Sequence, residues 1–403
     1  YVRFVKTGRR TWFWIAFVAF ILSLLSKATA VVLPLVLILI DQYLDRKWLS
    51  IKLTAEKLLF IIPALAFGLL TLYLHRSFGS LTNASEFSIA ERLFIAGRGV
   101  MYYLSKTVWP LDLSPYNQLP GSLNTTLVIE ILFYWVLIAI AIYTIFRIRF
   151  KNRLLFFSAG FFVVTVFLFL VPPGVPVMVS ERYAYIPSLG LFLIIASIFE
   201  RVFVKPQPVR NTAFVILSAY LLFISVLTWQ QAKVWKNSLS LWSHVIEVRG
   251  ELFYPILQRG NAYRERGNYE KAMDDFNRAI NLNPRYHRTY EKRGHLFLLL
   301  RDYDNAINDF NRASSLFPKS AFAHCSLGFA YRQTGDLPLA IEHLNRSIEL
   351  DNDYADAWFN RGKTHLEVGL ISRGCADLQT AITKGLTHED QKESKQLIRL
   401  HCR

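Results

Sequence analysis

A spacing of 34 residues recurs through the last third of this chain and limits what it can fold into. Glycines mark the spacing at Gly260, Gly294, Gly328 and Gly362. Small residues repeat it at Ala272, Ala306, Ala340 and Gly374, and again at Ala279, Ala313, Ser347 and Ala381. Large residues repeat it at Phe276, Phe310, Leu344 and Leu378. Such a period indicates stacked units, each too small to bury its apolar face alone.

The composition of each unit predicts a pair of packed helices. Small residues let two helices approach closely, and large residues fill the space between successive units. The turn sequences "GNY", "RDY" and "GDL" separate the two helices of the first three units. This pattern is typical of tetratricopeptide repeats. We predict four of them at 253–286, 287–320, 321–354 and 355–388, followed by a capping helix and tail at 389–403.

The first helix of each unit is expected to line a concave surface. The exposed positions there mix aromatic and charged side chains, which suits a peptide or protein partner. The predicted peptide-binding residues are Tyr254, Asn261, Arg264, Phe322, Phe329, Arg332 and Phe359. A solvated inner face without a fixed ligand is the alternative. His295 and His365 are interpreted as packing or surface residues, so we predict no metal site and no cofactor.

The first part of the chain is too apolar for an ordinary soluble domain. Over the whole chain 53% of the residues are hydrophobic and 31 are Phe, and a membrane span needs about 20 mostly apolar residues. Seven candidate spans lie at 11–25, 28–44, 58–74, 127–146, 154–171, 183–199 and 212–229. The expected fold class is all-α: a polytopic transmembrane helix bundle at 1–232 with a long outer loop at 75–126, a linker at 233–252, then the repeat superhelix.

The formal charge of +16 is concentrated before the repeats. Residues 251–403 hold 22 Lys and Arg against 20 Asp and Glu, whereas residues 1–250 hold 24 against 10. The excess lies in short loops between apolar runs, as the positive-inside rule expects, so we predict no nucleic-acid partner. Four of these loops share one side of the membrane, which is then cytoplasmic: 1–10, 45–57, 147–153 and 200–211.

With seven spans, Lys27, the segment 75–126 and the repeats lie on the opposite, extracytoplasmic side. The partly apolar segment 91–110 is interrupted by Arg92, Arg98 and Lys106, so we expect a helix lying in the outer interface rather than a span. Asp41, near the end of its apolar run, is interpreted as an interfacial stop signal.

Cysteine usage is sparse. Cys325, Cys375 and Cys402 are odd in number and show no metal-ligand spacing. They fit buried or free thiols better than a disulfide framework.

Three segments together resemble a known family. They are "LSLLSKATAVVLPLVLILIDQYL" (22–44), "YYLSKTVWPLDLSPYNQLPGSLN" (102–124) and "SERYAYIPSLGLFLIIA" (180–196). They look like bacterial relatives of the transmembrane, tetratricopeptide-repeat-containing O-mannosyltransferases, which resemble C-type glycosyltransferases. The resemblance implies sugar transfer from a polyprenyl-phosphate sugar to a protein hydroxyl on the extracytoplasmic face. It also implies an acidic general base in the first outer loop, which we expect upstream of Tyr1, so the catalytic residue is unknown.

The segment "VPVMVSERYAYIPSLG" (175–190) places a Glu-Arg pair at the outer mouth of a predicted span. There Arg182 and Lys27 are candidates to hold the lipid phosphate, because a cation is a stronger partner in a partly dry site. Glu181 is a candidate for orienting Arg182 or the sugar hydroxyls. Tyr183 and Tyr185 would support lipid or sugar. Alternatively, the pair ends a helix and the two tyrosines anchor it at the interface.

Two other functions remain open from the sequence. A membrane-anchored scaffold would use the repeats to recruit partners for envelope assembly and would need no chemistry. A transporter is less favoured, because charged residues deep inside the predicted spans are nearly absent.

Overall fold

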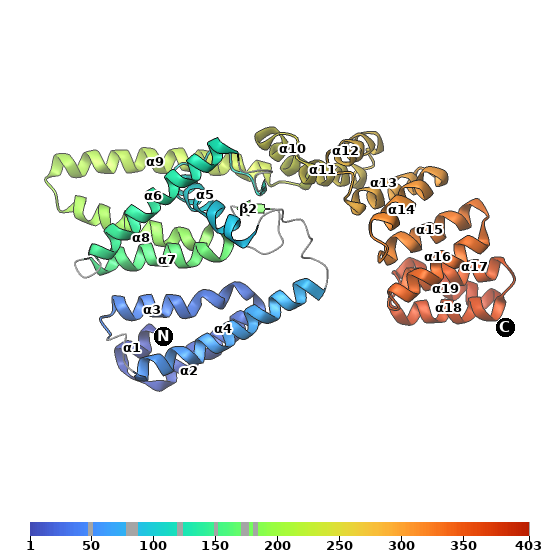
Figure 1. Cartoon of the computed structure of the whole chain (residues 1–403), viewed down its shortest axis with the longest axis horizontal. Coiled ribbons are helices and arrows are strands. Elements are labelled where there is room, and N and C mark those ends of the chain that lie inside the picture. Colours follow the sequence, from blue (N-terminus) through green and yellow to red (C-terminus); the bar gives the residue numbers. More distant parts are fainter. Residues whose placement is uncertain are drawn as a thin grey trace. The chain divides into compact units, whose positions relative to one another are not determined.

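The computed structural model describes residues 1–46, 51–77, 88–118, 124–148, 152–170, 177–179 and 184–402. It divides into two compact units, Tyr1–Lys233 and Val234–Arg403. Both units are built from helices (Figure 1), so the all-α prediction holds for the described part of the chain.

The first unit contains the apolar helices. Its elements are α1 (Val2–Thr7), α2 (Arg10–Ser26), the 3-10 helix η1 (Ala28–Val32), α3 (Leu33–Tyr43), α4 (Ile51–Ser77), α5 (Ile89–Val108), α6 (Thr125–Ile148), α7 (Arg153–Leu170), α8 (Tyr185–Phe203) and α9 (Gln207–Val234). Two short strands, β1 (Asn117–Gln118) and β2 (Val177–Val179), pair antiparallel.

Each of the seven predicted spans overlaps a described helix, and the span 28–44 covers η1 and α3. Four are long and apolar enough to cross a membrane by length and composition: Leu53–Thr71, Thr125–Arg147, Tyr185–Phe203 and Gln207–Val234. The other three correspond to shorter apolar helices, at Arg10–Ser26, Thr29–Tyr43 and Arg153–Val166. Seven crossings therefore stay a prediction.

Aromatic packing forms one core of this unit. Phe60 of α4 is fully buried, and Phe13, Phe17 and Phe20 of α2 surround its ring at centroid distances of 5.6, 5.5 and 5.4 Å. These side chains recur on one face of α2 at helical spacing, which is why that helix packs on α4.

A second core joins α5, α6, α7 and α8. Helix α5 buries Ile95 and Tyr103 with Ile131 of α6 and Phe162 of α7. Helix α8 lies against α7 at Gly190, where a Cβ atom would stand 2.4 Å from the Ser158 carbonyl oxygen. Only glycine fits this contact. The predicted interfacial segment 91–110 therefore forms a helix packed on the candidate spans, and its depth in a membrane stays a prediction.

The second unit is a row of helix pairs. Helix α10 (Ser238–Arg249) comes first and α19 (His388–His401) comes last. Between them lie four helix pairs: α11 (Phe253–Glu265) with α12 (Tyr269–Leu282), α13 (His287–Leu299) with α14 (Tyr303–Leu316), α15 (Ala321–Thr334) with α16 (Leu337–Leu350), and α17 (Ala355–Glu367) with α18 (Ile371–Lys384). The first helix of each pair begins at the first residue of a predicted unit.

Helix α10 lies in the segment 233–252 that was expected to be a linker. Asn237 begins it with a reciprocal capping interaction with Ser240, and Ile246 packs against the buried core of the first repeat. Residues 234–252 are therefore part of the second unit.

The 34-residue period produces the core of this unit. Phe276, Phe310, Leu344 and Leu378 are fully buried. Each packs against the repeating glycine of the same unit, and a Cβ atom at Gly328 would stand 2.4 Å from Leu344 Cγ. Small and large residues at fixed positions thus set the distance between paired helices, as the sequence predicts.

Candidate functional sites

The predicted lipid-phosphate site lies mostly outside the described residues. Glu181, Arg182 and Tyr183 belong to the segment 180–183, which the structure does not describe. Lys27 follows the last residue of α2 and its side chain is exposed, and Tyr185 is the first residue of α8 with 78% of its surface exposed. Whether these five residues form one site stays a prediction.

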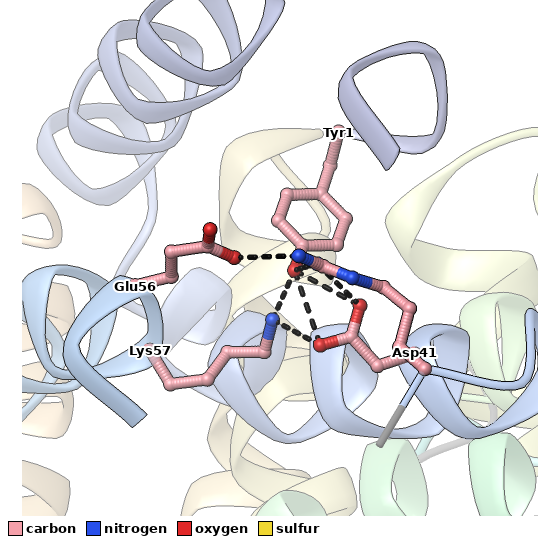
Figure 2. Close-up of polar contacts among 5 residues, drawn as sticks. Tyr1, Asp41, Glu56 and Lys57 are labelled. Atoms are coloured by element: carbon pink, nitrogen blue, oxygen red, sulfur yellow. Dashed lines mark hydrogen bonds and ion pairs between the residues drawn. The ribbon is translucent and has the colours of Figure 1, made fainter. Parts of the chain in front are cut away.

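A buried polar network joins Tyr1, which precedes α1, to α3 and α4 (Figure 2). Asp41 of α3 is 2% exposed. Its carboxylate accepts from the Tyr1 hydroxyl at 3.0 Å, from Arg46 Nη1 at 3.2 Å and from Lys57 Nζ at 2.5 Å. The Tyr1 hydroxyl in turn accepts from Arg46 and Lys57, and Arg46 Nη2 also reaches Glu56 at 3.1 Å.

This network shows that Asp41 is paired inside the first unit, and its position at a membrane interface stays a prediction. Two carboxylates face two cations, so the cluster is neutral, and each charge has a partner that offsets its desolvation. Both oxygens of Asp41 are engaged by protein groups. The arrangement therefore suits fixing α3 and α4 together rather than binding a substrate. Sequence reasoning missed it because the partners come from three separate segments.

The predicted peptide-binding residues of the repeats lie in two different environments. In the first two repeats Tyr254 is half-buried with its ring against Trp242, and Arg264 Nη1 lies 3.1 Å from His295 Nδ1. Burial and the nearby Arg264 guanidinium lower the pKa of His295, so the neutral ring can accept this hydrogen bond. Asn261 is half-buried on the same surface.

In the last two repeats most of these residues are engaged with the protein itself. Arg332 has 8% of its side chain exposed and forms an ion pair with Glu367 at 2.8 Å. Its guanidinium also lies over Phe329, 5.5 Å from the ring centroid. Phe359 is only 7% exposed, whereas Phe322 is 38% exposed.

Helix α19 contributes to this difference. Its Glu393 pairs with Lys363 at 2.5 Å, and the Lys363 ammonium lies 5.0 Å from the Phe359 ring centroid. Leu397 and Ile398 of α19 pack against the Phe359 cluster. Of the seven predicted residues, Tyr254, Asn261, Arg264 and Phe322 are therefore the ones best placed to meet a partner.

Three repeats carry a buried Arg-Asp pair between their two helices. The pairs are Arg259–Asp275, Arg293–Asp309 and Arg361–Asp377, each with two hydrogen bonds of 2.7–2.8 Å. Hydrogen bonding to the carboxylate raises the pKa of Arg259 and of Arg293. The 34-residue spacing of both residue types was the available signal, and the sequence interpretation did not use it. In the third repeat the two positions hold Leu327 and His343.

A disulfide bond joins Cys375 of α18 to Cys402, with their Cα atoms 5.9 Å apart. The expectation of free thiols is wrong for these two residues. Helix α19 folds back along α18 and so brings together cysteines that are 27 residues apart in sequence. Cys325 is the free cysteine, and burial raises its pKa to about 12, so it behaves as an inert buried thiol.

Comparisons with known proteins identify the repeats. A "TPR repeat" family model matches residues 260–301 and 330–369, and a "Tetratricopeptide repeat" model matches residues 287–320. No curated protein matches the chain.

Solved structures of several repeat proteins are similar to part of the chain. YrrB, "a TPR protein with an unusual peptide-binding site", is 22% identical with a TM-score of 0.34, covering 43% of this chain and 87% of its own. A thermophilic TPR protein from Thermus thermophilus is 14% identical with a TM-score of 0.37, covering 43% and 94%. MamA from Desulfovibrio magneticus RS-1 is 21% identical with a TM-score of 0.31, covering 40% and 84%.

The family matches confirm that the chain contains tetratricopeptide repeats, which supports a role in protein–protein interaction. They lie within residues 260–369, so the resemblance to O-mannosyltransferases stays a prediction.

Proposed function

We propose that this chain is an integral membrane protein of a bacterial inner membrane that holds its repeats on the extracytoplasmic side, where they bind a protein partner. The four long apolar helices support the membrane part. The repeats, with the partly open surface around Tyr254, Asn261, Arg264 and Phe322, support the partner-binding part.

The Cys375–Cys402 disulfide is the observation that carries the proposed location. Disulfides form and persist in oxidising compartments and are rare in the cytosol. The positive loops independently favour the same side, because they place the segment after the last span opposite the cytosol. Two unrelated features therefore agree on one orientation.

Within this orientation we propose that the full protein transfers a sugar from a polyprenyl-phosphate donor to a protein hydroxyl. The bond between the sugar anomeric carbon and the lipid phosphate breaks, and the acceptor oxygen forms the new glycosidic bond. The acceptor proton passes to a general base, and the lipid phosphate leaves as an anion. This proposal is based on the resemblance of segments 22–44, 102–124 and 180–196.

In this mechanism the chain's own residues would act on the donor. Arg182 and Lys27 would bind the lipid phosphate and stabilise its negative charge as it leaves. Glu181 would orient Arg182 or contact sugar hydroxyls, and Tyr183 and Tyr185 would pack on lipid or sugar. The repeats would raise the local concentration of the protein acceptor next to the donor.

The test uses the full-length protein in lipid vesicles, with a radiolabelled polyprenyl-phosphate sugar and an acceptor protein. Arg182→Ala is expected to lower transfer by at least about a hundredfold, because one charged contact to the leaving group is lost. Arg147→Ala, on the predicted cytoplasmic side, is the matched control and should leave transfer unchanged. Equal transfer by the Arg182→Ala and Arg147→Ala variants would remove Arg182 from the proposed site.

A non-enzymatic scaffold is the second candidate, and the repeats themselves favour it. In that case the membrane unit only anchors the repeats, and partners bind to them for envelope assembly. The same vesicles discriminate the two, because a scaffold binds its partner but transfers no sugar in any variant.

A further inference from the structure

The third repeat contains two neighbouring histidines and lacks the Arg-Asp pair of the other three repeats. His324 of α15 and His343 of α16 are half-buried, and their Nδ1 atoms are 3.2 Å apart. The two ring planes are within 24° of each other. His343 occupies the position that holds the aspartate of the Arg-Asp pair in the other three repeats, and Leu327 occupies the position of the arginine.

The surroundings help to hold the pair. The Nδ1 atom of His324 faces the Nδ1 atom of His343. Tyr331 stacks on His343 with the planes 5° apart and the centroids 5.4 Å apart.

We propose that His324 and His343 together bind a transition-metal ion of the class that prefers imidazole, such as Zn²⁺ or Cu²⁺, through their two Nδ1 atoms. Such ions bind imidazole nitrogen at about 2.0–2.1 Å. At square-planar or tetrahedral angles, two such nitrogens are about 2.8–3.4 Å apart. The observed separation falls in this range. Solvent would fill the remaining coordination positions.

The charges around the pair permit this role. A metal ion binds the neutral form of imidazole, which is also the form in which two ring nitrogens can face each other at 3.2 Å through one hydrogen bond. Glu342 lies next to His343 and favours positive charge there. Arg346 opposes positive charge at His324, but it is paired with Glu349 at 2.9 Å.

Binding requires no net loss of a proton. A neutral imidazole carries one N–H, and in the unoccupied pair one ring donates from Nδ1 to the other. When the ion binds, that ring moves its proton to Nε2 by exchange with solvent. No spacing in the sequence indicated a metal site, because the two ligands are on different helices. Over the described chain no group of three or more potential ligands converges, so this is a weak two-ligand site.

The test titrates the detergent-solubilised full chain with ZnCl₂ by calorimetry, and with Cu²⁺ by electron paramagnetic resonance. The double variant Leu327→Arg, His343→Asp introduces the Arg-Asp pair of the neighbouring repeats, which is expected to keep the repeat folded. Loss of one of two imidazoles is expected to weaken Zn²⁺ binding at least about tenfold, since even supporting residues contribute that much to metal affinity. Cu²⁺ should show two-nitrogen coordination in the wild type only. His388→Ala, an exposed histidine on α19, is the matched control and should bind as the wild type does.

Two results would overturn the proposal. Saturable binding of equal strength in the wild type and the double variant would place the ion elsewhere on the chain. No saturable binding in the wild type would leave the pair as a hydrogen bond only.

Discussion

The buried Arg-Asp pairs show how single residues stabilise the repeat array. The aspartates are nearly inaccessible and each receives two hydrogen bonds from one guanidinium. An arginine at a half-buried helical position is readily interpreted as a solvated side chain. Its partner is 16 residues away on the next helix, so the i, i+4 rule for helix pairs did not indicate it.

Asp309→Ala should therefore destabilise the second repeat. It leaves the Arg293 guanidinium half-buried without its carboxylate, which typically costs about 3 kcal/mol in the free energy of unfolding. The exposed Asp304, on the same helix α14, is the matched control, and its replacement by Ala should cost less than about 1 kcal/mol. Hydrogen–deuterium exchange of α13 and α14 in the full chain measures both. Equal exchange in the two variants would show that the pair contributes little.

In the first unit, Asp41 is the buried carboxylate expected to stabilise the packing of two helices. Asp41→Ala leaves Lys57 and Arg46 facing each other without their shared carboxylate, so we expect the contact between α3 and α4 to loosen. Asp45→Asn is the control, since the side chain of Asp45 is exposed and asparagine tolerates its left-handed backbone with φ 62°. Limited proteolysis in detergent should cut the Asp41→Ala variant at least several-fold faster. Equal cleavage of both variants would contradict a stabilising role for the network.

At the scale of elements, periodic signals predicted more than local ones. The 34-residue spacing predicted the first residue of the first helix in every repeat. It could do so because the same small and large residues must recur at the same packing positions in each unit. Helix α10 was missed because a single helix of 12 residues carries no period and is flanked by polar residues. The disulfide was missed because it depends on α19 folding back along α18, which no spacing in the sequence records.

The disulfide predicts a specific response of α19. Cys375→Ser combined with Cys402→Ser should lower the free energy of opening of α19 by about 3 kcal/mol, the usual effect of a loop of this size. The effect should be confined to α19 and the Lys363–Glu393 pair. Hydrogen exchange measures it, and a reductant should reproduce it in the wild type and change nothing in the double variant. Unaltered exchange of α19 in the double variant would contradict a stapling role.

The repeat histidines predict a pH dependence. Burial lowers the pKa of five of them in the folded array: His287, His295, His324, His343 and His365. In the unfolded chain their pKa is about 6.5, so below that pH the unfolded state binds more protons. Stability should be full above about pH 6.5 and fall as the pH decreases. Thermal unfolding of the repeats between about pH 7.5 and about pH 5.5 tests this, and a flat profile would contradict it. The Leu327→Arg, His343→Asp variant should show a weaker dependence.

For the whole molecule, the division into an apolar helical unit and a repeat unit could be predicted from composition and period alone. The geometry of the proposed substrate site stays a prediction, because Glu181, Arg182 and Tyr183 lie outside the described residues. The peptide-binding surface stays a prediction. No spacing in the sequence indicated that Arg332 pairs with Glu367 or that α19 packs against Phe359, because those contacts link separate repeats.

The orientation of the repeats is the central claim, since both the disulfide and the proposed sugar transfer depend on it. The most direct measurement fuses either alkaline phosphatase or green fluorescent protein to Arg403 of the full chain in a bacterial inner membrane. A fusion after Ile148 of the truncated chain is the control for the cytoplasmic side. We expect phosphatase activity without fluorescence at Arg403, and the reverse at Ile148. Fluorescence without phosphatase activity at Arg403 would place the repeats in the cytosol and contradict the account.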